Sequence, residues 1–316
     1  MRNWSKNMER YELSEQYYIQ RANPEQFSIY ESVYGDKNIN RFAVKHWDLR
    51  TAISLDNPFA KNESYYWIKQ DEIIIGGVLI EPNVISRLFF VPPFTKVYDI
   101  LKLLKRLLIK WSDSSKKIYA YQISPEQFEY FEMLGFLCDK KRRWMMRPTE
   151  VFDIVWDDDI ITKTPSEDNK QEIAKLLYLS FKGSIDYQHL INELGQEPTV
   201  KDYLEEVDEY FDWCKENIFF EASTLIYSKK ENKLLGACLV SYCEEWPLVH
   251  AIGVNPNYRG RHLASIMLKR ALTVLQGKYP VLRLFVTLGN DAESVYHQLG
   301  FVKGTEFRKL YIPANE

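Results

Sequence analysis

The stretch Leu248-Val-His-Ala-Ile-Gly-Val-Asn-Pro-Asn-Tyr-Arg-Gly-Arg-His-Leu-Ala-Ser265 joins an apolar strand to an amphipathic helix through a short polar turn. The first N–H groups of a helix have no partner inside the helix, and they lie at the positive end of its dipole. Gly260 permits backbone angles that a Cβ would forbid, and Arg259 and Arg261 add positive charge beside these amides. The sequence therefore predicts an anion site at this junction. A solvated surface turn is the plainer alternative.

The length and composition set the general class of the protein. A chain of 316 residues favours two domains, and 46% hydrophobic with 27% charged residues is typical of a globular protein. The formal net charge of −3 provides no broad basic surface, so we expect no nucleic-acid partner. The sequence shows no secretory signal and no apolar run long enough to span a bilayer, so we expect a cytoplasmic protein without a membrane partner.

The cysteines and histidines show none of the spacings that are typical of metal sites. They are Cys138, Cys214, Cys238 and Cys243, and His46, His189, His250, His262 and His297. Two of the cysteines lie in strand-like runs and none forms a CxxC pair, so we expect free thiols rather than disulfides. We expect no metal.

Hydrophobic periodicity predicts an α/β fold in which both halves follow the order β-α-β-β-β-α-β-α-β. In the first half, the predicted strands are 16–19, 64–69, 73–81, 84–91, 117–123 and 143–146, and the predicted helices are 23–33, 96–111 and 125–134. In the second half, the predicted strands are 160–164, 223–227, 234–242, 248–254, 281–287 and 308–312, and the predicted helices are 167–181, 260–276 and 292–299, with an added helix over 200–214.

Matching residues in the two halves indicate a tandem duplication. Three pairs recur in order at a nearly constant separation, namely Gly76 with Gly236, Val91 with Val254, and Gly135 with Gly300. The acidic run Asp157-Asp158-Asp159 is predicted to be a solvated linker between the copies. We therefore predict domains over residues 1–150 and 151–316.

The opening stretch and a second one, Asn290-Asp-Ala-Glu-Ser-Val-Tyr-His-Gln-Leu-Gly-Phe301, together resemble the two signature motifs of the GNAT superfamily of acetyl-CoA-dependent N-acetyltransferases. The resemblance covers the second half closely and the first half only as a degenerate echo. It implies two tandem GNAT-like domains, each with a mostly antiparallel central sheet flanked by helices, and catalysis in the C-terminal one.

The resemblance also implies a set of residues that bind acetyl-CoA as a co-substrate. In the family, an R/Q-x-x-G-x-G/A loop surrounds the CoA pyrophosphate with main-chain amides, and the preceding strand pairs with the pantetheine arm. The corresponding residues here are Ile252, Gly253, Val254, Arg259, Gly260, Arg261, His262, Leu263, Ala264 and Ser265, together with Asn290 and Tyr296. His262 stands where the family usually has glycine, and a side chain there restricts how closely the backbone can approach a phosphate.

The same resemblance suggests catalytic roles. Tyr296 matches the tyrosine that can protonate the departing CoA thiolate, a step that suits a phenol whose ordinary pKa is about 10. For the base, strand alternation places His250 on the face of Ile252, and arylalkylamine N-acetyltransferases are similar in having a histidine in that strand. A structural core histidine is an equal alternative, and Glu244 and Glu245 are other candidate bases.

The first half lacks these residues. Lys96-Val-Tyr-Asp99 stands at the position of the anion-binding turn, with no glycine and with an aspartate that would repel a phosphate. Phe131 replaces the tyrosine and Pro125 replaces the asparagine of the second motif. We expect the N-terminal copy to be a cofactor-free partner.

The leading hypothesis is transfer of an acetyl group to a primary amine of a small-molecule or peptide acceptor by direct attack. The acidic helix around residues 202–209 weakly favours a cationic acceptor, although a solvated helix face explains these charges more simply. A non-catalytic acyl-CoA-binding or regulatory module is the alternative, and an aminoacyl transferase is a weaker one. The sequence identifies neither the acceptor nor the oligomeric state.

Overall fold

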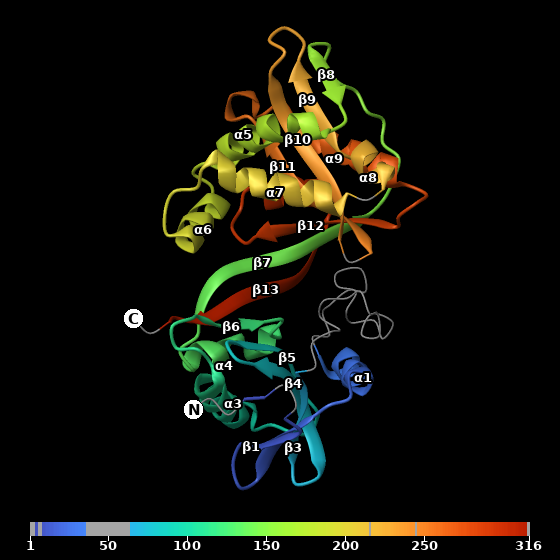
Figure 1. Ribbon diagram of the computed structural model, residues 1–316. Helices are drawn as coiled ribbons and strands as arrows, with labels where there is room; N and C mark the ends of the chain where they lie inside the picture. The colour runs from blue at the N-terminus through green and yellow to red at the C-terminus, as the bar shows by residue number, and fades with distance from the viewer. Residues whose placement is uncertain (1–3, 6–7, 36–63, 215, 244, 315–316) are drawn as a thin grey trace. The chain divides into compact units, whose positions relative to one another are not determined.

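The computed structural model describes residues 4, 5, 8–35, 64–214, 216–243 and 245–314. The chain divides into two compact units (Figure 1). Unit 1 comprises Met1–Arg142 with Thr305–Glu316, and unit 2 comprises Arg143–Gly304.

Unit 1 is a sheet in the order β1-β2-β3-β4-β5-β6-β13, in which β5 and β6 pair in parallel and the other neighbours among the described strands pair antiparallel. Its strands are β1 (Arg10–Glu12), β2 (Tyr17–Arg21), β3 (Tyr65–Gln70), β4 (Ile73–Glu81), β5 (Val84–Phe90), β6 (Ile118–Tyr121) and the later part of β13 (Val302–Ile312). Its helices are α1 (Pro24–Tyr34), α3 (Val97–Trp111), the 3-10 turn η2 (Pro125–Gln127) and α4 (Phe128–Met133).

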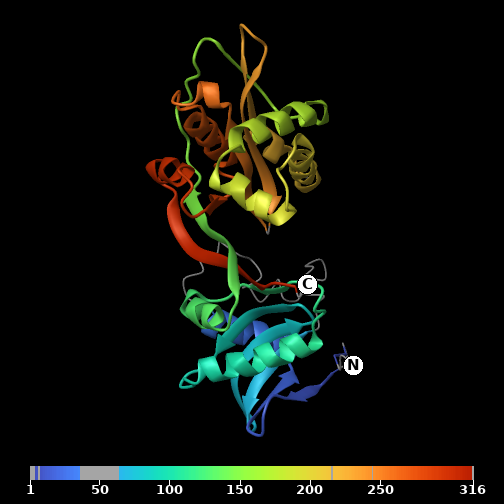
Figure 2. The same cartoon turned by 90° about the vertical axis from the view of Figure 1, so that its left-hand side faces the viewer.

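Helices cover both faces of this sheet. The amphipathic α3 lies across the strands (Figure 2). Its apolar face is buried, with Leu104, Leu108 and Trp111 completely covered. On the opposite face, Phe27 of α1 packs against Tyr65, Trp67 and Phe89 in a separate aromatic cluster. Alternate side chains of β3 and β5 point to opposite faces, so the two layers follow directly from strand periodicity.

Unit 2 is a sheet in the order β7-β12-β11-β10-β9-β8, and its β11 and β12 are parallel. Its strands are the later part of β7 (Leu137–Pro148), β8 (Ile160–Lys163), β9 (Thr224–Ser228), β10 (Leu234–Cys243), β11 (Trp246–Val254) and β12 (Val281–Thr287). Its helices are η3 (Glu167–Asn169), α5 (Lys170–Phe181), α6 (Ile185–Leu194), α7 (Val200–Trp213), α8 (Asn217–Ala222), η4 (Pro256–Tyr258), α9 (Leu263–Leu275) and α10 (Ala292–Gln298).

Helices pack closely on both faces of this sheet as well. A Cβ at Gly253 of β11 would lie 2.9 Å from Ser180 Oγ of α5, so this helix approaches the strand more closely than a side chain would allow. A Cβ at Gly236 of β10 would lie 3.3 Å from Met267 of α9. The two helices therefore sandwich the strands that lead into the anion-binding turn.

The mixed α/β sheets confirm the predicted fold class, and the predicted elements are found. The structure adds β1, α6 and α8, which the sequence analysis did not predict. Each unit also contains a strand from the other half of the sequence. Leu310 of β13 pairs with Ala120 in the core of unit 1, and Met145 of β7 is buried in the core of unit 2. Compact units and duplicated copies are different properties, so the copy limits 1–150 and 151–316 stay a prediction.

Candidate functional site

A pocket of about 340 Å³ lies at the junction between β11 and α9. Its lining residues are Ile252, Gly253, Val254, Tyr258, Arg259, Gly260, His262, Leu263, Ala264, Ser265, Val295 and Tyr296. The structure thus brings together the predicted cofactor-binding residues except Arg261 and Asn290. Tyr258 and Val295 were not predicted, although each adjoins a predicted residue in the sequence.

The turn before α9 depends on two residues in the left-handed region of backbone space. Gly260 has φ +80°, and His262 has φ +56° and ψ +16°. Histidine is among the non-glycine residues that adopt this region more often, at a cost of about 1 kcal/mol. His262 therefore follows the backbone course that a glycine would take, which is how the turn accommodates the departure from the family pattern.

The N-terminus of α9 presents unpaired amides to the pocket. The first hydrogen bond inside the helix is donated by the Ile266 N–H to the His262 carbonyl, at 3.0 Å. The N–H groups of Leu263, Ala264 and Ser265 precede it and belong to residues that line the pocket. No side chain caps these amides within the described part of the chain. Helix geometry and dipole together therefore favour an anion at this position.

The two arginines of the turn are held by protein groups. Arg259 Nη2 donates to the Ser180 carbonyl at the end of α5, at 2.6 Å. Arg261 Nη2 contacts Asp157 Oδ2 at 2.6 Å and Asp159 Oδ1 at 2.8 Å. These two contacts raise the pKa of Arg261, and the hydrogen bond from Arg261 lowers the pKa of Asp159. Arg259 lines the pocket from this anchored position, whereas Arg261 points to the acidic linker.

The strand β11 separates from β12 beside the pocket. Their parallel register consists of Leu248 with Arg283 and Val249 with Leu284 among the described residues. On the other side, the Asn255 N–H donates to the Leu235 carbonyl of β10, at 2.8 Å. Because backbone groups alternate along a strand, the amides of Ile252 and Val254 face the diverging side. They are available to a ligand that carries amide groups.

Tyr296 lines the same pocket from α10 and is 8% exposed. Burial raises its pKa, and nearby Cys238 and Asp186 raise the pKa further. No hydrogen-bond partner of its hydroxyl is found among the described residues. The phenol is therefore protonated at neutral pH and free to act on a bound ligand.

Asn290 lies next to the pocket but is used structurally. Its Nδ2 donates to Asp186 Oδ2 at 2.6 Å, and its Oδ1 accepts from the Ala292 N–H at 2.9 Å. Thr287 Oγ1 also donates to Asp186. Asp186 therefore ties α6 to the end of β12 and the start of α10. The sequence analysis missed this residue because it did not predict α6.

His250 is enclosed by polar and aromatic neighbours. Its Nδ1 lies 3.2 Å from Ser241 Oγ and its Nε2 lies 3.1 Å from the Glu206 carbonyl, and the Trp213 ring centroid is 5.3 Å away. Because a carbonyl only accepts, Nε2 donates and Nδ1 accepts from Ser241. Burial lowers the pKa of the imidazole, so the ring is neutral at pH 7.

A β-bulge explains why His250 contacts α7. The register of β10 with β11 shifts between the Leu239–Ala251 and Val240–Val249 pairs, which leaves His250 as the extra residue. The bulge interrupts the strict alternation on which the predicted shared face with Ile252 rested. Of the other candidate bases, Glu244 lies outside the described residues, and Glu245 adopts φ +69° after β10.

The described residues contain no group of three or more His, Cys, Asp or Glu side chains that could hold a metal ion. The four cysteines are free thiols. Within the same residues, no helix combines the length and apolar character needed to cross a membrane.

The pocket lies in a part of the chain that matches a known protein family. Residues 187–301 match the model of the Acetyltransferase (GNAT) family. No curated protein matches the sequence. The solved structure of a GCN5-related N-acetyltransferase from Sphaerobacter thermophilus is 14% identical, with a TM-score of 0.62 over 96% of this chain and 98% of that one.

Two further solved structures are similar in fold. A Drosophila protein is 10% identical, with a TM-score of 0.50 over 94% of this chain and 99% of that one. A glucosamine N-acetyltransferase region of a fungal multi-domain β-N-acetylglucosaminidase is 10% identical, with a TM-score of 0.51 over 94% of this chain and 38% of that one. At these identities the likeness concerns the fold alone. Residues 187–301, which carry the pocket, therefore match the GNAT acetyltransferase family model, and the chain as a whole is similar in fold to a solved GCN5-related N-acetyltransferase.

Proposed function

We propose that unit 2 transfers the acetyl group of acetyl-CoA to a primary amine by direct attack. One observation carries this proposal: the unpaired amides of α9 and the free hydroxyl of Tyr296 line a single pocket. An anion site and an acid are the two groups that a CoA thioester requires at its opposite ends. The match of residues 187–301 to the GNAT family model supports acyl transfer in general, while the acetyl group and the amine belong to the proposal.

The residues of the pocket suit the parts of acetyl-CoA. The amides of Leu263 to Ser265 would receive the pyrophosphate, because they combine hydrogen-bond donors with the positive end of a helix dipole. The outward amides of Ile252 and Val254 would pair with the pantetheine arm as an added strand. This arrangement directs the thioester toward the region between β11 and β12.

The chemical step needs one acid and one base. The amine nitrogen forms a bond to the carbonyl carbon, the C–S bond breaks, and the sulfur takes the proton of the Tyr296 hydroxyl. Burial raises the pKa of Tyr296, but it also raises the pKa of a thiol in the same pocket, so proton transfer stays feasible. The proton lost by the amine goes to a base or to water.

His250 is our candidate for this base. Its Nε2–H is engaged by the Glu206 carbonyl, so a proton would have to arrive at Nδ1 through the Ser241 hydroxyl. Its lowered pKa keeps the ring neutral, as a base requires. The engagement of both ring nitrogens also favours a second candidate function, a module that binds acyl-CoA without turning it over.

The acidic helix α7 gives little guidance to the acceptor. Asp202 caps the helix by accepting from the Thr199 N–H at 2.6 Å, and Asp208 pairs with Lys170 at 2.8 Å. These acids have structural partners, so they provide no argument for a cationic acceptor.

Acetyl-CoA titration and CoA release together test the proposal. We expect saturating acetyl-CoA to raise the melting temperature, because a ligand selective for the native state stabilises it. We then expect free CoA thiol to appear with one member of a panel of small amines, polyamines, amino acids and peptides. Binding without thiol release would favour the non-catalytic module, and an unchanged melting temperature would reject the site assignment itself.

A further inference from the structure

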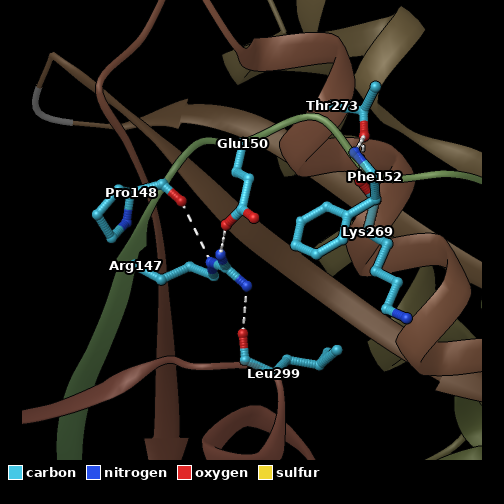
Figure 3. A network of polar contacts seen from close by, with 7 residues as sticks. All are labelled: Arg147, Pro148, Glu150, Phe152, Lys269, Thr273 and Leu299. Carbon is cyan, nitrogen blue, oxygen red and sulfur yellow. Dashed lines mark hydrogen bonds and ion pairs between the residues drawn. The ribbon is translucent and has the colours of Figure 1, made fainter.

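The segment between β7 and β8 is fastened along α9 at its beginning (Figure 3). Arg147 donates to the Leu299 carbonyl and pairs with Glu150, and its guanidinium lies 4.9 Å from the centroid of the Phe152 ring. The Phe152 N–H donates to Thr273 Oγ1 in the last turns of α9, at 2.9 Å. Thus the segment is attached beside the C-terminal part of this helix.

The same segment is fastened again near the N-terminal end of α9. Asp157 and Asp159 both accept from Arg261 Nη2, at 2.6 and 2.8 Å. The Lys229 N–H donates to the Asp159 carbonyl at 2.8 Å, and its Nζ donates to the Asp158 carbonyl at 2.5 Å. The segment therefore runs along the length of α9 and ends beside the Gly260–His262 turn that precedes this helix.

Arg261 is poorly placed to bind a phosphate. It sits between Gly260 and His262, which both line the pocket, but it is not among the described residues that line it. Its single positive charge already faces two carboxylates, so the net charge of this group of three side chains is negative. An incoming pyrophosphate would meet this acidic pair rather than an available guanidinium.

The Gly260–His262 turn needs contacts from other segments of the chain to hold its conformation. Gly260 and His262 both hold positive φ angles, and no described side chain caps the helix that follows. A residue keeps an unfavourable backbone conformation only when the contacts around it hold it in that conformation. The contacts of Arg261 with the linker are of this kind, because they fix the residue directly before His262, whose left-handed backbone is unfavourable for a residue with a Cβ.

We propose that Asp157 and Asp159 are positioning residues, which act through Arg261 to hold the Gly260–His262 turn so that the α9 amides face the cofactor. This inference rests on the proposed function in unit 2. It assigns Arg261 to the support of the loop rather than to direct phosphate contact. The charge run of the linker then has a specific role beyond solvation.

Calorimetric titration with acetyl-CoA tests the inference on the full chain. We expect the double variant Asp157→Asn/Asp159→Asn to raise the Kd about fivefold, as expected for loss of a small exposed ion network. Turnover at saturating acetyl-CoA should stay within about twofold of wild type, because the reacting groups are untouched. Arg261→Gln should have the same effect on the Kd, and the triple variant should be no weaker, because the residues act through one another.

A charge-matched control comes from the same linker. Asp153 and Asp158 are exposed, and their carboxylates have no hydrogen-bond or ion-pair partner in the described part of the chain. Asp153→Asn/Asp158→Asn also removes two negative charges from the linker but leaves the partners of Arg261 in place. Its Kd for acetyl-CoA should therefore match that of wild type. If instead Arg261→Gln weakens binding while the Asp157/Asp159 variant binds as tightly as wild type or more tightly, Arg261 contacts the phosphate and the inference is wrong.

Hydrogen exchange on the unliganded chain separates this inference from the proposed function. The Ile266 amide, whose hydrogen bond to the His262 carbonyl depends on the geometry of the turn, should exchange faster in the Asp157/Asp159 variant than in wild type or in the control double variant. Equal exchange in all three would overturn the inference whatever the cofactor. Failure of wild type to bind acetyl-CoA would overturn the proposed function alone, and the exchange result would still decide the role of the linker.

Discussion

The two units build the same strand-to-helix junction with opposite results. In unit 2, Gly260 and His262 turn the chain through positive φ angles, and the first amides of α9 line a pocket. In unit 1, α3 begins after Lys96, which has φ −82°, and its first turn contains Asp99. An acidic residue at a helix start already occupies the positive end of the dipole and repels another anion. One turn is therefore suited to a phosphate and the other is not.

The strands before these junctions, β5 and β11, also differ in whether they leave space for a ligand. Both β5 and β11 contain a bulge, and the correspondence of Val91 with Val254 places Arg87 at the position of His250. Arg87 Nε donates to Gln122 Oε1 just after β6, at 3.3 Å, so a side chain links the two parallel strands. In unit 2 the corresponding strands diverge beside the pocket. A shared fold thus supplies the framework, and a few side chains decide whether it can hold a ligand.

The buried cluster in unit 1 continues this contrast. Arg87 lies 3.6 Å from Glu31 and donates to the Tyr65 hydroxyl at 3.1 Å, and all three side chains are buried. Burial raises the pKa of Glu31 to about 7, although the charge of Arg87 opposes the shift. Ionisable groups at this position of unit 1 are therefore part of the folded core.

The largest expected effect comes from making unit 2 resemble unit 1 at Tyr296, where unit 1 has Phe131. Tyr296→Phe should lower kcat by about 100-fold or more, because it removes a general acid. The KM for acetyl-CoA should change little. Steady-state release of CoA thiol measures both. Tyr279→Phe removes a hydroxyl of the same unit outside the pocket and should leave kcat unchanged. Equal turnover of Tyr296→Phe and wild type across the pH range would remove the proposed acid.

The next effect concerns the buried carboxylate of unit 1 and its pH dependence. The pKa of Glu31 rises from 4.5 to about 7 on folding, so the native state keeps a proton that the unfolded state loses in this window. Stability from this group is therefore present at low pH and is lost as pH rises through the window. Relative to wild type, Glu31→Gln should gain up to about 3 kcal/mol of unfolding free energy between pH 5 and pH 8.

Chemical denaturation at several pH values measures this difference, and a constant cost of breaking the contact with Arg87 does not affect its slope. Glu25→Gln, at an exposed position of the same helix, should give a curve parallel to wild type. If the unfolding free energies of Glu31→Gln and wild type changed in parallel with pH, the Glu31 carboxylate would ionise as freely in the folded state as in the unfolded state. The cluster of Glu31, Tyr65 and Arg87 would then not be buried from solvent.

A smaller effect should come from the backbone of the turn in unit 2. Gly260 has φ +80° and open space around an added Cβ, so Gly260→Ala introduces backbone strain of about 1 kcal/mol and no clash. We expect the Kd for acetyl-CoA to rise about fivefold. Gly277 has the same φ and the same open surroundings after the other end of α9. Gly277→Ala should destabilise the fold equally without weakening the binding of acetyl-CoA. If both variants weakened this binding equally, the turn would have no local role.

The smallest effect is expected where the chain departs from the family pattern. His262 already has the backbone angles of a glycine, so His262→Gly should change the Kd for acetyl-CoA by less than about twofold. His262→Val should weaken binding more, since a β-branched residue is a strong outlier at positive φ. Calorimetry on the pair distinguishes backbone shape from side-chain contact. A large loss in His262→Gly would show that the imidazole itself binds the cofactor.

Much of the fold and site could be predicted because it is encoded locally. The apolar periodicity of α3 and α9 is visible over single helical segments, and both helices form, although α9 begins at Leu263 and not at the predicted residue 260. Gly260 and the residues after it define a helix start without reference to any distant residue. In contrast, α6 and α8 are short, and α6 buries little more than Tyr187, so their patterns are weak. The missing α6 is also why Asp186 escaped prediction.

The sequence by itself determined the order of the elements other than β1, α6 and α8, and it showed a glycine-containing turn before α9 that the first half of the chain lacks, because short-range periodicity and backbone freedom decide these features. Only the tertiary structure decided which partners the charged and titratable residues take. Arg261 meets Asp157 and Asp159, and His250 meets Ser241 and a carbonyl of α7, through contacts between distant segments. A bulge of one residue and the course of a linker fix these pairings, and neither leaves a periodic signal in the sequence.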